Sequence, residues 1–216
     1  MKKRVLIFVL IVGMAMMVGC SSPYGKYQNK ISEIRNHVFE GNCNNFTVSA
    51  VSGEREQPFE IDGEPGERID FTVITIKPKI FDISSSYDYK LIYDGNEFTG
   101  EFVRHPFNET YSAEISLKIT SDFVLKVNGD ECEITMQSIK TDNFISAKKA
   151  FDVAVEKLKS TIKQLDKYEI YIRLTKNPVN DSEGYYWYVA FVDGQNTYAV
   201  LIEPETANII ASKEME

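Results

Sequence analysis

Apolar and polar residues alternate one by one through most of the middle of the chain, from Asn45 to Ser138. A period of two places every second side chain on the same face of a β-strand. Turn sequences such as Asp94-Gly95 and Asn128-Gly129 join neighbouring segments into hairpins. The alternating segments read FTVSAV, IDFTVITI, YDYKLIY, EFTGEFV, SAEISLKI, DFVLKV and ECEITM. Strands of this length and spacing predict a β-sandwich of immunoglobulin-like type over residues 42–140.

The hydrophobic period lengthens before this region. Apolar residues recur there three or four positions apart, at Tyr27, Ile31, Ile34 and Val38. This spacing is that of one face of a helix, and glycine is common where helices end. Residues 20–41 are therefore expected to form the N-terminal segment of the mature chain, with an amphipathic helix over residues 24–40 that Gly41 ends.

Helical spacing returns after Thr141. The stripe of this second predicted helix contains Ala147, Phe151, Ala154, Leu158, Ile162 and Leu165. Ser146 is placed to cap its N-terminus. Three strand-like runs follow, YEIYIRLT, YYWYVAFV and TYAVLIEP, and a short NIIAS ends the region. A helix followed by an antiparallel meander predicts a compact α+β domain over residues 141–216, and the overall class is mostly β with α+β.

The helix over Ala147–Ala154, the strand YYWYVAF and the closing YAVLIEPETANII together resemble a PepSY-type domain. PepSY domains are small extracytoplasmic modules of bacterial envelope proteins. The chain departs from the family pattern with Glu203 in place of the usual aspartate and Ala207 in place of the glycine. The resemblance implies a binding or peptidase-modulating role and no active site.

The first residues, MKKRVLIFVLIVGMAMMVGCSS, have the layout of an export signal. A basic head precedes an apolar stretch that is too short for a comfortable membrane span. The junction Gly19-Cys20 resembles the lipobox of bacterial lipoproteins, with Met17 in place of the usual leucine. The resemblance implies that residues 1–19 are removed and that a lipid on Cys20 anchors the extracytoplasmic protein to the cell membrane. The alternative is an ordinary signal peptide with a coincidental cysteine.

Charge limits the class of partner. The chain has a formal net charge of −8, and removal of the three positive charges of the signal leaves −11. A surface this acidic repels nucleic acid and anionic lipid headgroups, so neither is an expected partner.

Two cysteines remain once Cys20 is assigned to lipid. Cys43 and Cys132 make one candidate disulfide in an oxidising compartment, and two buried free thiols are the alternative.

No arrangement of residues typical of catalysis is visible, and no enzyme activity, metal or cofactor is predicted. The two histidines, His37 and His105, are far apart and have no metal-ligand spacing. The acidic segments EIDGEPGERID and NPVNDSEG lack the spaced ligands of a calcium loop. Both are interpreted as solvated turns.

Aromatic residues concentrate in the C-terminal hairpin. Trp187 lies in the middle of its strand and is predicted to be buried in the core. Tyr185 and Tyr198 lie nearer the hairpin ends and are predicted to reach solvent. The helix can cover only one sheet face, which leaves Tyr171 and Arg173 on the other. These four residues are the candidate contacts for another envelope protein or peptide, and the oligomeric state stays open.

The function predicted from sequence is thus a non-catalytic binding or regulatory module of the cell envelope. One alternative is a carbohydrate-binding module that presents Tyr87, Tyr89 and Tyr93 to cell-wall glycan. Another is an envelope hydrolase whose pocket sequence alone does not reveal.

Overall fold

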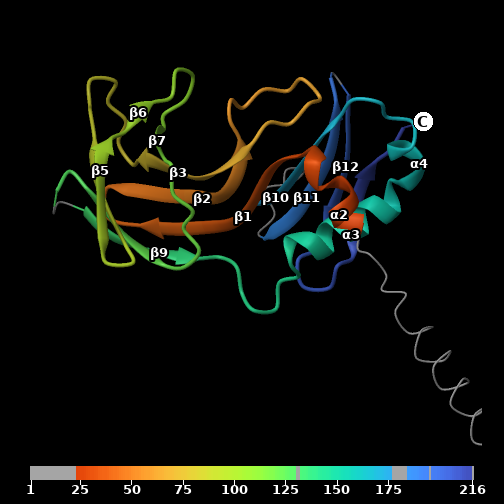
Figure 1. Ribbon diagram of the computed structural model, residues 1–216. Helices are drawn as coiled ribbons and strands as arrows, with labels where there is room; N and C mark the ends of the chain where they lie inside the picture. The colour runs from red at the N-terminus through yellow and green to blue at the C-terminus, as the bar shows by residue number, and fades with distance from the viewer. Residues whose placement is uncertain (1–22, 130–131, 177–183, 195, 216) are drawn as a thin grey trace, which may run out of the picture.

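The structure, a computed structural model, describes residues 23–129, 132–176, 184–194 and 196–215. The predicted signal peptide and Cys20 lie outside these residues. The chain is mostly β, as predicted from the alternation (Figure 1). Its elements are α2 (Pro23–Tyr27), η1 (Gln28–Lys30), β1 (Ile31–Asn42), β2 (Phe46–Glu56), β3 (Arg68–Pro78), β4 (Asp88–Tyr93), β5 (Asn96–Glu101), β6 (Val103–Arg104), β7 (Tyr111–Ile115), β8 (Phe123–Val127), β9 (Cys132–Ser138), α3 (Ala147–Lys157), α4 (Lys159–Ile162), β10 (Glu169–Lys176), β11 (Tyr185–Asp193), β12 (Asn196–Ile202) and β13 (Ile209–Lys213).

One continuous sheet runs through the described part of the chain in the order β13-β12-β11-β10-β1-β2-β3-β7-β6. A second row, β9-β8-β4-β5, joins it where β9 pairs with the end of β1. Strand β1 is therefore shared. Its first residues run parallel to β10, its last residues run antiparallel to β9, and β2 pairs with it along most of its length.

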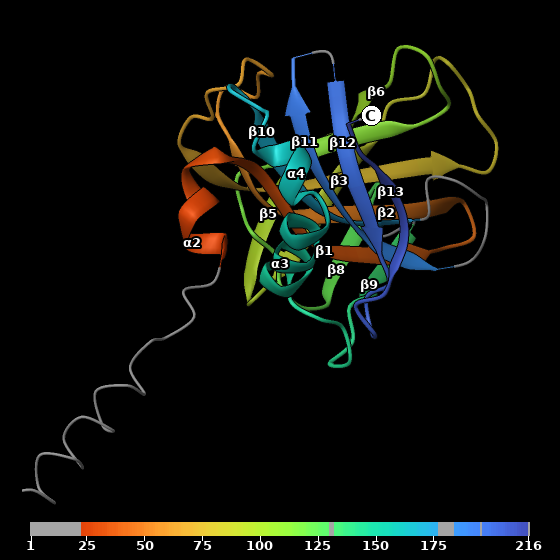
Figure 2. The same cartoon turned by 90° about the vertical axis from the view of Figure 1, so that its right-hand side faces the viewer.

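The helices gather at one end of the molecule, beside β10, β11 and β12 (Figure 1). Seen from that end, α3 and α4 lie in front of these strands, and β1, β2 and β3 run crosswise behind them (Figure 2). The helix that covers one face of the C-terminal strands is the one that the sequence predicts. Its N-cap is Ser146, whose hydroxyl accepts from the Lys149 backbone N–H at 3.2 Å. The predicted helix is interrupted at Leu158, where α3 gives way to α4.

Two hydrophobic cores form on either side of the shared strand. The first lies between the helices and β10–β12 and includes the start of β1. Trp187 belongs to it, is fully buried, and donates its indole N–H to the Ile145 carbonyl at 3.2 Å, which confirms its predicted core position. The second core is enclosed by β1, β2, β3 and β7 against β4, β8 and β9.

The predicted helix over residues 24–40 is wrong. Only residues 23–30 are helical, in two short turns, and Ile31 begins a twelve-residue strand. The physical reason is that β1 changes register twice, between Ile31 and Glu33 and between Arg35 and His37. Each irregularity shifts the alternation by one residue, so the apolar positions of this strand fall at helix-like spacing in the sequence.

Cys43 and Cys132 form a disulfide that joins the end of β1 to the start of β9, across a sequence separation of 89 residues. The bridge fixes one closed end of the second core. Within the described residues, no helix is long and apolar enough to cross a membrane.

Candidate functional site

Strands β1 and β10 separate after a short parallel pairing, and the separation opens a cleft. Their ladder runs from Ile31↔Ile170 to Arg35↔Arg173 and ends there. Beyond that point β1 turns to β9, whereas β10 stays with β11 as far as Lys176. The gap is a cleft of about 260 Å³, called here the split-sheet cleft. It is lined by Arg35, Val38, Glu40, Ser49, Val51, Leu174, Thr175, Lys176 and Tyr185.

One end of the split-sheet cleft is fixed by Glu40. Its carboxylate accepts a hydrogen bond from the Tyr185 hydroxyl at 2.6 Å and pairs with the Lys176 ammonium. Burial, with the bond to Glu40, raises the pKa of Tyr185 above its ordinary value. Burial opposes ionisation of Glu40, but the bonds from Lys176 and Tyr185 outweigh it and lower the pKa of Glu40. This end therefore holds a carboxylate that is already matched by a cation and a hydroxyl.

The opposite end carries an excess of positive charge. Arg35 donates its Nε to the Glu33 carboxylate at 2.8 Å, and Arg173 donates its Nε to the other oxygen of the same carboxylate at 2.9 Å. Glu33 is buried, whereas the two guanidinium side chains are 30% and 28% exposed. Arg55, the cross-strand neighbour of Glu33 on β2, pairs with the exposed Glu114. Glu33, Arg35, Arg55 and Arg173 are called the arginine cluster.

Aromatic rings hold the arginine cluster in place. The Arg173 guanidinium lies over the Tyr171 ring, 4.7 Å from its centre. Arg55 lies in the same way over Phe59 and Phe71, at 5.5 and 4.9 Å. A cation above an aromatic face is attracted by the ring and loses freedom of orientation. The guanidinium groups are therefore positioned before any ligand arrives.

The loop between β2 and β3, residues 57–67, covers Tyr171. The ring of Phe59 meets the Tyr171 ring edge to face at 6.1 Å. Two buried carboxylates hold the loop down through its backbone. Glu169 accepts from the N–H groups of Asp62 and Gly63, each at 2.7 Å, and Glu56 accepts from Gly66 at 2.8 Å.

The same carboxylates reach the sheet below. Tyr171 donates its hydroxyl to Glu169 at 2.6 Å, and Ser32 donates to Glu56. Burial and the bond to Glu169 raise the pKa of Tyr171 above its ordinary value. The tyrosine is thus a fixed part of the fold beneath the loop.

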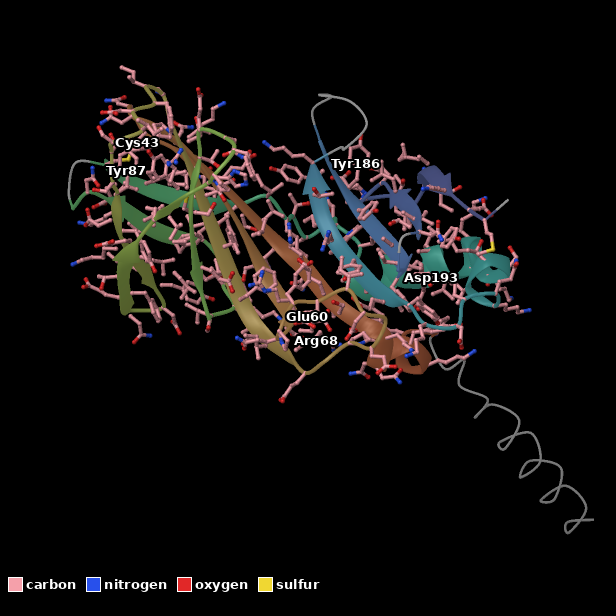
Figure 3. The ribbon with its side chains drawn as sticks, turned by 90° about the horizontal axis from the view of Figure 1, so that it is seen from above. Cys43, Glu60, Arg68, Tyr87, Tyr186 and Asp193 are labelled. Carbon is pink, nitrogen blue, oxygen red and sulfur yellow. A yellow bond between two sulfur atoms is a disulfide. The ribbon has the colours of Figure 1, made fainter. Side chains whose placement is uncertain are left out.

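The four residues that the sequence singles out fare differently. Tyr198 is 9% exposed, so the prediction that it reaches solvent is wrong. Tyr171, on the other face of the sheet, is 3% exposed. The loop covers Tyr171, and Tyr198 is part of the first core. Tyr185 is half-buried in the split-sheet cleft, and Arg173 is partly exposed in the arginine cluster. Figure 3 shows Tyr186 and Asp193 at opposite ends of β11, which spans the sheet beside this region.

Sequence reasoning missed Glu33, Arg35 and Glu40. The predicted helix over residues 24–40 hid them, because a helix would have pointed Glu33 and Arg35 to opposite sides and would have placed neither beside the Tyr171–Arg173 strand. The sequence does contain a signal for this cluster: Glu33 and Arg35 alternate in one segment, and Tyr171 and Arg173 alternate in another. Only the parallel pairing of β1 with β10 reveals that the two patterns lie side by side.

The three tyrosines of the alternative carbohydrate-binding prediction do not form an exposed row. Tyr87 and Tyr89 are 9% and 8% exposed and belong to the second core, and the half-buried Tyr93 packs against this core. Tyr87 lies near the disulfide, at the end of the molecule away from the helices (Figure 3).

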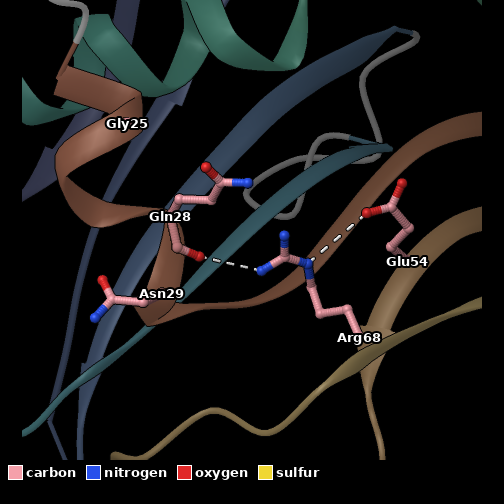
Figure 4. Close-up of a pocket in the computed structure, with 5 residues that line it drawn as sticks. All are labelled: Gly25, Gln28, Asn29, Glu54 and Arg68. Atoms are coloured by element: carbon pink, nitrogen blue, oxygen red, sulfur yellow. Dashed lines mark hydrogen bonds and ion pairs between the residues drawn. The ribbon is translucent and has the colours of Figure 1, made fainter.

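A larger cavity of about 510 Å³ lies next to the N-terminal turns, lined by Gly25, Gln28, Asn29, Glu54 and Arg68 (Figure 4). Arg68 crosses it and donates Nη1 to the backbone carbonyls of Gln28 at 3.2 Å and Ile31 at 2.7 Å. Its Nε lies 3.8 Å from Glu54, too far for a hydrogen bond. The arginine therefore ties the N-terminal segment to β3, which is a structural task.

Within the described part of the chain, no three His, Cys, Asp or Glu side chains come together as a metal site. No protein-family model, curated protein or solved structure matches the chain. The geometry of the split-sheet cleft and the arginine cluster is therefore the basis for a functional proposal.

Proposed function

We propose that the chain is a lipid-anchored, extracytoplasmic binding module of a bacterial cell envelope, without catalytic activity, and that it captures an extended peptide segment of another envelope protein. In this proposal an immunoglobulin-like sandwich is joined to a PepSY-like unit, and the bound segment belongs to a protein such as a peptidase that the module regulates. The lipobox-like Gly19-Cys20 junction supports the anchor.

One observation carries the proposal: β10 loses its neighbour halfway along. From Leu174 to Lys176 its backbone pairs with β11 on one side, whereas its ladder with β1 has ended at Arg173. An exposed strand edge offers regularly spaced N–H and C=O groups, and an extended peptide can pair with them as an added strand. The split-sheet cleft provides such an edge at Thr175 and Lys176, which are accessible, whereas Leu174 is fully buried. Val38 and Val51 give the cleft apolar walls.

The turn after β12 supports the PepSY-like part of the proposal. Glu203 takes the position of the family's aspartate and accepts from the Thr206 backbone N–H at 2.9 Å. Ala207 takes the position of the family's glycine and has φ +64°, a conformation in which glycine is favoured. The backbone at this turn thus suits the residue that the family carries.

Site-specific photo-crosslinking in the native envelope tests the peptide proposal. A photoreactive amino acid replaces Thr175 in the split-sheet cleft, and the matched control replaces Thr99 on the exposed β5. We expect Thr175 alone to give a discrete product whose crosslinked residues map to one linear segment of an envelope protein. Equal yields at both positions, or products that map to scattered surfaces, would contradict it. Ser49→Phe, which fills the cleft, should abolish the Thr175 product.

The anchor has its own test. Cys20→Ala should release the mature protein from the membrane fraction, because acylation requires the thiol. A variant that stays in the membrane fraction with its signal cleaved rules the lipid anchor out and leaves the cleft proposal untouched.

A further inference from the structure

The arginine cluster has more cations than are needed to balance the carboxylates that pair with them. Glu33 is a single buried anion, yet it accepts from both Arg35 and Arg173. Arg55, across from Glu33, is matched by Glu114. The ion-paired groups of the cluster, three arginines with Glu33 and Glu114, therefore sum to one surplus positive charge, in a chain whose formal net charge is −8. The nearby buried carboxylates of Glu56 and Glu169 lie outside this count, because hydrogen bonds from Ser32, Tyr171 and the loop N–H groups hold them. A buried glutamate needs one guanidinium to compensate its charge, so the second one needs another explanation.

The two guanidinium groups are arranged as a pair. The parallel register sets Arg35 directly beside Arg173, and both side chains stand on the face of Glu33. Arg35 gives Glu33 its Nε, and its two Nη nitrogens have no hydrogen-bond partner among the described residues. Arg173 gives Glu33 both its Nε and its Nη2. A guanidinium offers five N–H donors in a planar fork that matches the two oxygens of a carboxylate.

The guanidinium groups of Arg35 and Arg173 repel each other. Burial lowers the pKa of Arg35, Glu33 raises it again, and the neighbouring cation of Arg173 lowers it further. An anion that bound across both guanidinium groups would relieve their mutual repulsion, in the way that an opposite charge favours an ionised form. Both side chains are partly exposed, so such an anion has access.

Arg35 also lines the split-sheet cleft, at the end away from Glu40. The two ends therefore differ in charge: Glu40 is already compensated by Lys176, and the arginine end has the surplus. A peptide in the cleft would meet a cationic end and a neutralised end, and this asymmetry would fix its direction.

We propose that Arg35 and Arg173, held by Glu33, form a carboxylate-binding subsite at one end of the split-sheet cleft. It reads a carboxylate of the captured peptide, either an acidic side chain or the C-terminus. Glu33 is the positioning residue, because it orients both guanidinium groups and limits how strongly they bind an anion. The inference rests on the proposed function for the identity of its ligand, but the subsite can be measured without a peptide.

The experiment titrates acetate into the full-length protein and follows the Nε–Hε signals of its arginines by NMR. Acetamide, a neutral molecule of the same shape, is the control ligand, and Arg104 on β6 is the internal control. We expect saturable shifts at Arg35 and Arg173 with acetate and none with acetamide. Equal responses at Arg35, Arg173 and Arg104, or equal responses to both ligands, would overturn the subsite.

Two further arms identify the source of the carboxylate. N-acetylvaline carries a terminal carboxylate, whereas the α-amide of N-acetylglutamate carries a side-chain carboxylate. The ligand that binds at least about tenfold more tightly marks the source, since tenfold corresponds to about 1.4 kcal/mol of selectivity. Equal affinity for the two would mean that the subsite reads the carboxylate alone, as acetate binding predicts.

Variants separate a binding role from a structural one. Arg35→Gln leaves one cation for one carboxylate and should weaken acetate binding at Arg173 at least about tenfold. Glu33→Gln removes the internal competitor and should tighten acetate binding, which a merely structural glutamate would not do. Arg104→Gln should change neither. Unchanged acetate binding in Arg35→Gln would contradict the claim that Arg35 and Arg173 bind the anion together. Failed crosslinking at Thr175 with intact acetate binding would remove the peptide proposal only.

Discussion

Trp187 shows how a single side chain can join two layers. Its ring is fully buried in the first core, where β11 faces the helices, and its N–H is matched by the carbonyl of Ile145 just before α3. The residue thus supplies both apolar area and a hydrogen bond that orders the chain leading into the helix. No other residue type offers this combination at that size.

Trp187→Ala should lower the free energy of unfolding by about 3–5 kcal/mol, because it leaves a large cavity and an unmatched carbonyl. Urea denaturation measures the loss. The control is Phe107→Ala, since Phe107 is 92% exposed and its loss should stay within about 0.5 kcal/mol. A Trp187→Ala loss as small as that of the control would mean that the ring lies outside the core.

Ala207 has a backbone conformation that costs energy. Its φ of +64° is favourable for glycine and unfavourable for a residue with a Cβ, by about 1–2 kcal/mol. Ala207→Gly should therefore raise the free energy of unfolding by about 0.5–1 kcal/mol after the entropy of the unfolded glycine is subtracted. Ala211→Gly, within strand β13, should lower the stability by a similar amount. Urea denaturation of both variants measures these changes. A lower free energy of unfolding in Ala207→Gly would show that the backbone conformation of Ala207 costs no energy.

At the scale of elements, β1 is the strand on which both cores depend. The sequence predicts β2–β5, β7–β13 and the α3 N-cap because their periods and turn residues are local. It does not predict β1, because its register shifts break the alternation and its parallel neighbour lies more than a hundred residues later. For the same reason, only part of the arginine cluster could be predicted from the sequence. Tyr171 and Arg173 stand on a recognisable strand, and Glu33 and Arg35 stand on β1.

His37 on β1 makes this strand sensitive to acid. Burial, and the charges of Lys140 and Lys118, lower the pKa of His37 from 6.5 to about 4. The unfolded chain therefore takes up a proton between pH 6.5 and about 4 that the folded chain refuses, so stability present above pH 6.5 is lost as the pH falls through this window. Solvent screening of the half-buried ring reduces the effect to about 1 kcal/mol at pH 5.

Replacing the histidine should remove this sensitivity. His37→Gln should lose about 1 kcal/mol less than the parent when urea denaturation at pH 7.5 is compared with pH 5.0. His105→Gln, in an exposed loop, is the control and should lose as much as the parent. Equal losses in all three proteins would show that His37 does not titrate with folding.

At the scale of the whole molecule, the disulfide closes the end of the second core that lies away from the helices (Figure 3). It joins residues 89 positions apart, so its main effect is to restrict the unfolded chain. The double variant Cys43→Ala with Cys132→Ala should lose about 3–4 kcal/mol of unfolding free energy. The parent in reductant should match it. Thiol labelling of Cys43 and Cys132 in the unfolded, non-reduced parent would contradict the bridge.

The sharing of β1 between the two cores also has a mechanical consequence. A pull on the N-terminal segment first meets the edge-to-face contacts of Tyr24 and Tyr27 with Phe151, then the bonds of Arg68 to the Gln28 and Ile31 carbonyls, and then the start of β1. Because β1 is bonded to β2 on one side and to β10 and then β9 on the other, a force along its axis loads these ladders together in shear. A force applied at the N-terminal end would thus be borne by the whole sheet, once the short turns before Ile31 had given up their contacts with Phe151.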